Sequence, residues 1–125
     1  MRILEMKVPA REENTLLLRM AVAGVGALYD VEVDVMDDLR SAVEESCDLL
    51  LHQDFSVQCL TLICDEEKDC LHLSISASKG CPQQTENTAD ADMAKMIIGT
   101  LVRQVELDQD ENGVHTVRMI LPAKV

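Results

Sequence analysis

Three carboxylates stand close together in an amphipathic stretch of the sequence, residues 35–53. Glu44 precedes Asp48 by four residues and Glu45 precedes it by three, so in a helix each of these pairs lies on a shared edge. Such an edge can hold a cation or activate a water molecule. Like charges at this spacing are also common on solvated helix surfaces, where they cost little stability. The spacing alone therefore favours a solvated acidic face over a catalytic one.

The helix that must position these acids is defined by its apolar stripe. Leu39, Val43, Cys47 and Leu50 recur at three- and four-residue spacing, which predicts that they face a sheet or another helix. Asp34 or Asp37 is expected to cap the start of this helix.

Other residue types that carry chemistry are scattered. His52, His72 and His115 show no metal-ligand spacing, so no metal site is predicted. The five cysteines are odd in number and form no CxxC pair, which indicates reduced, partly buried thiols. A reactive thiol at Cys81 is a minor alternative. A reactive thiol needs basic neighbours that lower its pKa, and Lys79 is the one basic residue near Cys81 in sequence.

Composition limits the classes of partner. The chain has 125 residues, 47% of them hydrophobic but only 2% aromatic, and a net charge of -12. This size suits a single domain that buries roughly two-thirds of its unfolded surface. The charge repels nucleic acid and anionic membranes, and it favours basic or cation-bearing partners. Because we find neither a signal-peptide pattern nor an apolar run of about 18 residues, we expect a soluble, cytoplasmic protein.

The order of the expected elements indicates the fold class. They are a strand at 3–8, a helix starting between 9 and 14, the helix at 35–53, strands at 55–64 and 70–77 joined by a charged turn at 65–69, a loop at 79–90, a helix at 93–104, and strands at 105–107 and 114–121. Strands in adjacent pairs predict a mostly antiparallel sheet with the helices on one face, an α+β two-layer sandwich.

Two helices carry further expectations. The first is apolar nearly all round, so it should be buried or paired with another helix, and Gly24 and Gly26 would let a neighbouring helix approach closely. The last helix is expected to turn a stripe inward that consists of Met93, Met96, Ile97, Thr100 and Leu101.

Three segments together resemble a known family. They are VPAREENTLLLRMAVAGV (8–25), DDLRSAVEESCDLLLH (37–52) and DENGVHTVRMILP (110–122). Their order and spacing resemble the anti-sigma factor and serine-kinase group of the GHKL ATPases, which have the Bergerat, or histidine kinase-like, fold. The resemblance covers nearly the whole chain and implies this fold for residues 1–125.

The resemblance also assigns roles to the acidic helix. Matched without gaps, the general base of the family falls on Glu45, and the asparagine that helps to hold magnesium falls on Leu49, which has no oxygen to offer. A shift of one residue gives Glu44, Asp48 and His52 instead. We prefer the ungapped register, in which the site is either catalytic or vestigial.

The glycine boxes that approach the nucleotide in this family are also altered. The adenine box falls on residues 76–81, which hold one glycine and no acid. The second box holds Asp92 and Ala94, and a carboxylate at a helix N-terminus competes with phosphate for the same site. The resemblance thus implies a vestigial pocket near Asp48, Leu49, Ala77, Gly80, Asp92 and Ala94. Without a bound nucleotide, we expect the loop at 79–90 to be the least ordered internal segment.

Three functions follow as hypotheses. The first is a regulator that binds a sigma factor or an anti-anti-sigma protein, with nucleotide binding and kinase activity lost or weakened. The second is an active serine kinase that uses ATP and magnesium to phosphorylate an anti-anti-sigma partner. The third is a scaffolding subunit, with a homodimer through the apolar first helix as one form of it.

Overall fold

The computed structural model describes residues 1–53, 55–82, 90–111 and 113–122. The elements in chain order are β1 (Arg2–Pro9), the short 3₁₀ helix η1 (Glu12–Asn14), α1 (Thr15–Leu28), α2 (Val33–Leu51), β2 (Phe55–Glu67), β3 (Cys70–Pro82), α3 (Ala91–Leu101), β4 (Gln104–Asp110) and β5 (Gly113–Pro122).

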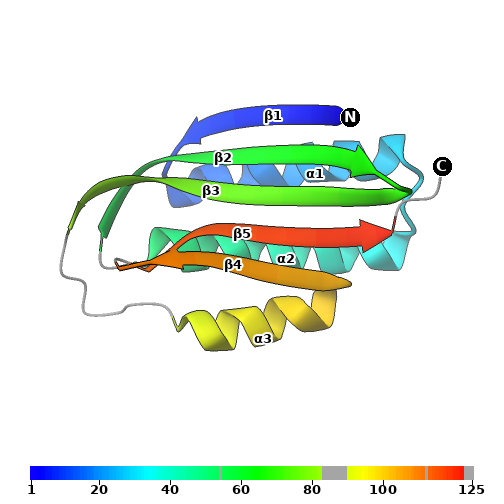
Figure 1. The fold of residues 1–125 in the computed structure, drawn as a ribbon. Coiled ribbons are helices and arrows are strands. Elements are labelled where there is room, and N and C mark those ends of the chain that lie inside the picture. Colours follow the sequence, from blue (N-terminus) through cyan, green and yellow to red (C-terminus); the bar gives the residue numbers. More distant parts are fainter. Residues whose placement is uncertain (54, 83–89, 112, 123–125) are drawn as a thin grey trace.

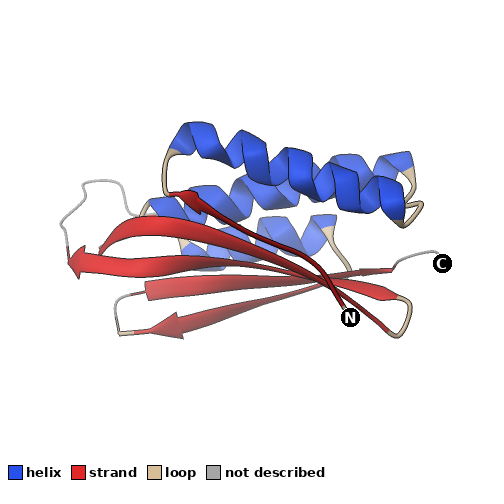
Figure 2. Ribbon diagram, turned by 90° about the horizontal axis from the view of Figure 1, so that it is seen from above, coloured by secondary structure: helices blue, strands red, loops and turns tan. Residues whose placement is uncertain are grey.

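The five strands form one antiparallel sheet in the order β1-β2-β3-β5-β4. All three α-helices lie on the same face of this sheet, and the opposite face is left open (Figure 1, Figure 2). This arrangement confirms the predicted α+β two-layer sandwich.

The core lies between the sheet and the helices. Alternate side chains of the three central strands are at most 1% exposed, and they are Leu60, Leu62, Cys64, Leu71, Leu73, Ile75, Val117, Met119 and Leu121. The predicted stripe of α2 meets them, since Leu39, Val43, Cys47 and Leu50 are equally buried. The prediction for this helix face is therefore confirmed.

Close contact between α1 and α2 depends on Gly26. A Cβ atom at this position would overlap the thioether of Met36, so the absence of a side chain allows the two helices to approach. Gly24 behaves differently from the prediction. A Cβ there would meet nothing within 4 Å among the described residues, because Gly24 lies on the outer side of α1.

The outer side of α1 is apolar and exposed. Leu18, Val22 and Val25 pack into the core, but other large side chains of this helix point away from it. These exposed side chains are Leu16, Leu17, Met20 and Leu28. The prediction that this helix is buried or paired with another helix is confirmed as to pairing, since α1 packs against α2, while its outer side is exposed.

The start of α2 differs from the prediction. The N-cap residue is Glu32, which is extended with φ of -61° and ψ of 149° and makes no side-chain capping hydrogen bond. Neither Asp34 nor Asp37 therefore caps the helix. Asp34 instead lies in the first turn, where its charge favours the positive end of the helix dipole.

The β2–β3 hairpin is longer than predicted. Its turn consists of Lys68 and Asp69, whose φ angles are 51° and 62°, as in the two-residue turns that match strand twist. Residues 65–67 thus extend β2 and pair with β3. Residues 79–82 belong to β3 and not to a loop, whereas residues 83–89, on which the prediction of low order mainly falls, lie outside the described residues.

The inward face of α3 is not the predicted one. Ala94 and Ile98 are buried, while Met93, Met96 and Ile97 are 59%, 74% and 38% exposed. The helix is apolar on nearly every side, so periodicity does not identify the side that faces the core. The predicted stripe is therefore wrong for Met93, Met96 and Ile97, although Leu101 does pack against the core. Helix α3 thus presents an apolar row to its surroundings.

Candidate functional site between the second and third helices

A groove runs between α2 and α3, which lie side by side on the sheet (Figure 1). One part has a volume of about 170 Å³ and is lined by Glu45, Asp48, Leu49, Asp90, Met93, Ala94 and Ile97. The adjoining part, of about 560 Å³, is lined by Ser41, Glu44, Glu45, Asp48, Ile97 and Leu101. The two parts share three residues, so we describe them as one feature, the α2–α3 groove.

The groove brings together part of the predicted site. Glu45 is half-buried and lines both parts, as Asp48 does, and Leu49 and Ala94 line the narrower part. Glu44 lines the wider part, whereas Ala77 and Asp92 do not belong to the described lining. Ala77 is buried in the core, Asp92 is exposed in the first turn of α3, and Gly80 belongs to β3.

Leu49 marks the position where the resemblance expects a magnesium-binding asparagine. Its side chain is 1% exposed and is part of the core cluster. Gln53 holds the end of α2 in place. Its Nε2 donates to the Leu49 carbonyl at 2.7 Å, and its Oε1 accepts from the Val114 amide at 3.3 Å. An aliphatic side chain gives a hard cation no ligand here.

The N-terminus of α3 is occupied by a carboxylate from the chain itself. Asp90 Oδ1 accepts hydrogen bonds from the amide of Asp92 at 3.0 Å and from the amide of Met93 at 3.2 Å. Free amides at a helix N-terminus form a site for anions, and here two of them are already paired. Sequence reasoning missed Asp90, although an acid directly before a helical pattern is a recognised N-cap signal.

The residues of the alternative register are held by other parts of the chain. Glu44 Oε2 lies 3.8 Å from Nη1 of Arg19 on α1. His52 Nδ1 lies 2.8 Å from the Asp48 carbonyl and 3.1 Å from Asp48 Oδ1, and its Nε2 lies 3.1 Å from Oε1 of Glu12. The hydrogen bond to the Asp48 carbonyl is the main cause that raises the pKa of His52, and the charges of Asp48 and Glu12 add to it. His52 thus links the end of α2 to η1.

The remaining histidines and cysteines that the structure describes lie apart from this groove. Among the described residues, no three His, Cys, Asp or Glu side chains are grouped so as to hold a metal ion. Burial raises the pKa of Cys47 and of Cys64 to about 12, so both thiols are protonated. Cys59 and Cys70 are half-buried and free. The side chain of Cys81 lies outside the described part, and its reactivity stays a prediction.

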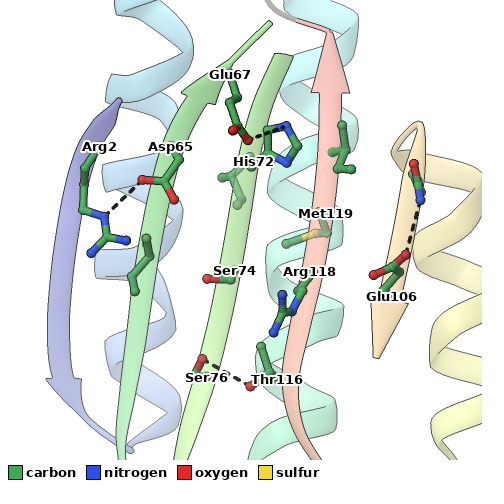
Figure 3. A pocket seen from close by; sticks show the side chains of 14 residues that line it. Arg2, Asp65, Glu67, His72, Ser74, Ser76, Glu106, Thr116, Arg118 and Met119 are labelled. Carbon is green, nitrogen blue, oxygen red and sulfur yellow. Dashed lines mark hydrogen bonds and ion pairs between the residues drawn. The ribbon is translucent and has the colours of Figure 1, made fainter. Parts of the chain in front are cut away.

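A separate hollow of about 480 Å³ lies on the open face of the sheet (Figure 3). Small polar side chains form its middle, including Ser74, Ser76 and Thr116, and ionic groups surround them. Arg2 Nε lies 3.1 Å from Oδ1 of Asp65, so these charges are paired with each other across neighbouring strands. No residue of the predicted site lies there.

None of the helices that the structure describes is both long enough and apolar enough to cross a membrane.

The strand order, the three helices on one face and the position of the groove define the class as a histidine kinase-like fold. A structure in the same class is the crystal structure of the RsbU and RsbW domains of Rv1364c from Mycobacterium tuberculosis. It matches with a TM-score of 0.72 over 97% of this chain and 33% of that chain, at 10% sequence identity, which demonstrates the shared fold.

Sequence comparison gives the closer relationship. The chain is 38% identical over 80 residues, 64% of its length, to anti-sigma-F factor RsbW of M. tuberculosis strains CDC 1551 / Oshkosh and H37Rv. It spans about half the length of these curated relatives, because the matched part is 46% of each. No family model matches the sequence. The chain is a homologue of anti-sigma-F factor RsbW over this stretch, which confirms the resemblance to the anti-sigma group.

Proposed function

We propose that this chain is an anti-sigma-type regulator that acts by binding a protein partner, either a sigma factor or an anti-anti-sigma protein, without turning over ATP. The observation that carries the proposal is the buried Leu49 at the floor of the groove, in a homologue of an anti-sigma factor. The fold and the net charge of -12 suit a cytoplasmic protein-binding domain.

The groove residues do not fit ATP with magnesium. Leu49 supplies no cation ligand, and Asp90 already accepts from two amides that a phosphate would need. The described lining contains Glu44, Glu45, Asp48 and Asp90 but no lysine, arginine or histidine. A polyphosphate in this groove would therefore meet carboxylates without a compensating cation. For this reason we assign no step of the function to a nucleotide.

Two alternatives rest on specific observations. An active serine kinase is supported by Glu45, which is half-buried in the groove at the position of the general base. A scaffolding subunit, including a homodimer, is supported by the exposed apolar side of α1, where Met20 and Leu28 are the most exposed residues.

The test uses sigma factors and anti-anti-sigma proteins from the native host. Each is mixed with the purified chain, and complex formation is measured once with ATP and magnesium and once with EDTA. We expect one of them to bind with a Kd that differs by less than about twofold between the two conditions. Binding that requires ATP, or transfer of the γ-phosphate to a serine of the partner, would support the kinase instead. Binding of none of these proteins, together with self-association, would support the scaffold.

A further inference from the structure

The outer side of α3 carries an apolar row beside the α2–α3 groove. Met93, Met96 and Ile97 are large, exposed and adjacent on successive turns. Met93, Ile97 and Leu101 follow each other at four-residue spacing and all line the groove. Single exposed apolar residues are ordinary, but a continuous row that borders a groove marks an interaction surface.

The opposite wall of the groove is acidic. Glu44, Glu45 and Asp48 stand on α2, and the N-cap residue of α3, Asp90, adds a carboxylate at one end of the groove. Arg19 lies near Glu44, His52 lies near Asp48, and Asp90 accepts hydrogen bonds from two amides. Among the described residues, Glu45 has no ion-pair partner. The acids of the open sheet face differ, since Arg2 pairs with Asp65 and Arg118 pairs with Asp108 at 2.7 Å. The described lining thus holds no lysine, arginine or histidine and keeps a net negative charge, which is centred on Glu45.

These two walls set the chemistry of the occupant. We propose that the α2–α3 groove docks a basic amphipathic helix of the protein partner, and this proposal rests on the function proposed above. The apolar side of that helix packs on Met93, Ile97 and Leu101, and its lysines or arginines face Glu45 and Asp48. Methionine side chains adapt to such partners. This is a helix-in-groove mode of recognition with charge complementarity along one edge.

The size of the groove sets the length of the docked segment. Helix α3 has 11 residues, which at 1.5 Å per residue span roughly 16 Å. A partner helix of about three turns, or roughly 11 residues, covers this length. Its apolar residues must recur at three- and four-residue spacing to stay on one side.

A designed peptide tests the groove directly. The probe is a fluorescein-labelled helical peptide of leucine and lysine, with the leucines on one side, and its Kd is measured by anisotropy at physiological ionic strength. We expect Glu45→Lys and Ile97→Asp each to weaken binding about tenfold or more. A peptide with glutamate in place of lysine should not bind.

Matched controls stand elsewhere on the chain. Glu67→Lys makes the same charge change on the open face of the sheet (Figure 3), and Met20→Asp makes a comparable change on the exposed side of α1. Each control should alter Kd by less than about twofold. Amide chemical-shift changes of the wild-type chain on adding the peptide should concentrate in α2 and α3. This measurement needs no variant, so it tests the groove even if Ile97→Asp folds poorly.

Several results would overturn the proposal. They are a wild-type chain that does not bind the peptide, a loss of binding with Glu67→Lys as large as with Glu45→Lys, and shift changes that concentrate on α1. The proposed function is tested separately, with whichever sigma factor or anti-anti-sigma protein binds the chain in the experiment described under the proposed function. If Ile97→Asp binds that partner as well as wild type does, the groove proposal fails while the proposed function stands. If wild type binds no sigma factor or anti-anti-sigma protein, the proposed function fails whatever the peptide does.

Discussion

Replacing Leu49 by asparagine tests whether this position belongs to the core or to a nucleotide site. Leu49 is 1% exposed, so the substitution removes most of the roughly 1.5–3 kcal/mol that a buried leucine contributes. It also buries an amide, which costs about 1–3 kcal/mol if it stays unpaired. We therefore expect Leu49→Asn to lower the free energy of unfolding by about 3–5 kcal/mol.

The same loss can be expressed as a change in Tm. An unfolding entropy of about 2.1 cal/mol/K per residue, applied to 125 residues, makes each kcal/mol worth about 4 °C. The predicted fall in Tm is thus roughly 10–20 °C. The chain has no tryptophan and one tyrosine, so urea and thermal unfolding are best followed by far-UV circular dichroism.

The control is Leu28→Asn, which makes the same chemical change at a position that is 77% exposed. It should change the free energy of unfolding by no more than about 0.5 kcal/mol. A loss below about 1 kcal/mol for Leu49→Asn would refute the assignment of Leu49 to the core. Because this variant restores the amide that the resemblance expects, recovery of its stability on adding ATP and magnesium would refute the proposal that Asp90 also blocks phosphate binding at the start of α3.

Three further predictions concern His52, two buried thiols and the start of α3. Because the pKa of His52 is raised by its hydrogen bond to a backbone carbonyl, its stabilising effect is fully present below its unfolded pKa of about 6.5 and is lost as pH rises through the folded value. The difference in unfolding free energy between wild type and His52→Gln should therefore shrink from pH 6 to pH 8, and a difference that grows would contradict this. Cys47 and Cys64, with pKa values of about 12, should react with a thiol reagent only after denaturation, as peptide mapping can establish; labelling of either in the native chain would count against their burial. Asp90→Ala should destabilise the chain by about 1 kcal/mol in urea unfolding, and an equal effect of Asp92→Ala would show that the cap is not responsible.

The two helices beside the groove show what sequence patterns can establish. In α2, charged residues separate the apolar positions, so Leu39, Val43 and Cys47 identify the buried side without ambiguity. In α3, apolar residues occur on nearly every side, and several stripes fit the spacing equally well. The choice is made by packing, because Ala94 and Ile98 are the residues that turn toward the core.

The candidate site was predictable where it depended on one element. The resemblance placed Glu45 and Leu49 on α2, and the structure brings them to the groove together with Ala94. Asp90 was missed because it ends a polar stretch that was predicted to be a loop. Its capping role follows only when α3 is known to begin at Ala91, two residues before the predicted start. The apolar row on α3 was missed because it was predicted to face inward.

The most direct test of the proposed loss of nucleotide binding is thermal unfolding of the wild-type chain with and without saturating ATP and magnesium. A ligand at about 100 times its Kd would add roughly 2.7 kcal/mol, which for this chain corresponds to a rise in Tm of about 10 °C. We predict no change in Tm on addition of ATP and magnesium. A saturable rise of that size would contradict the account, because it would require nucleotide binding where Leu49 offers no cation ligand and Asp90 already accepts from two amides.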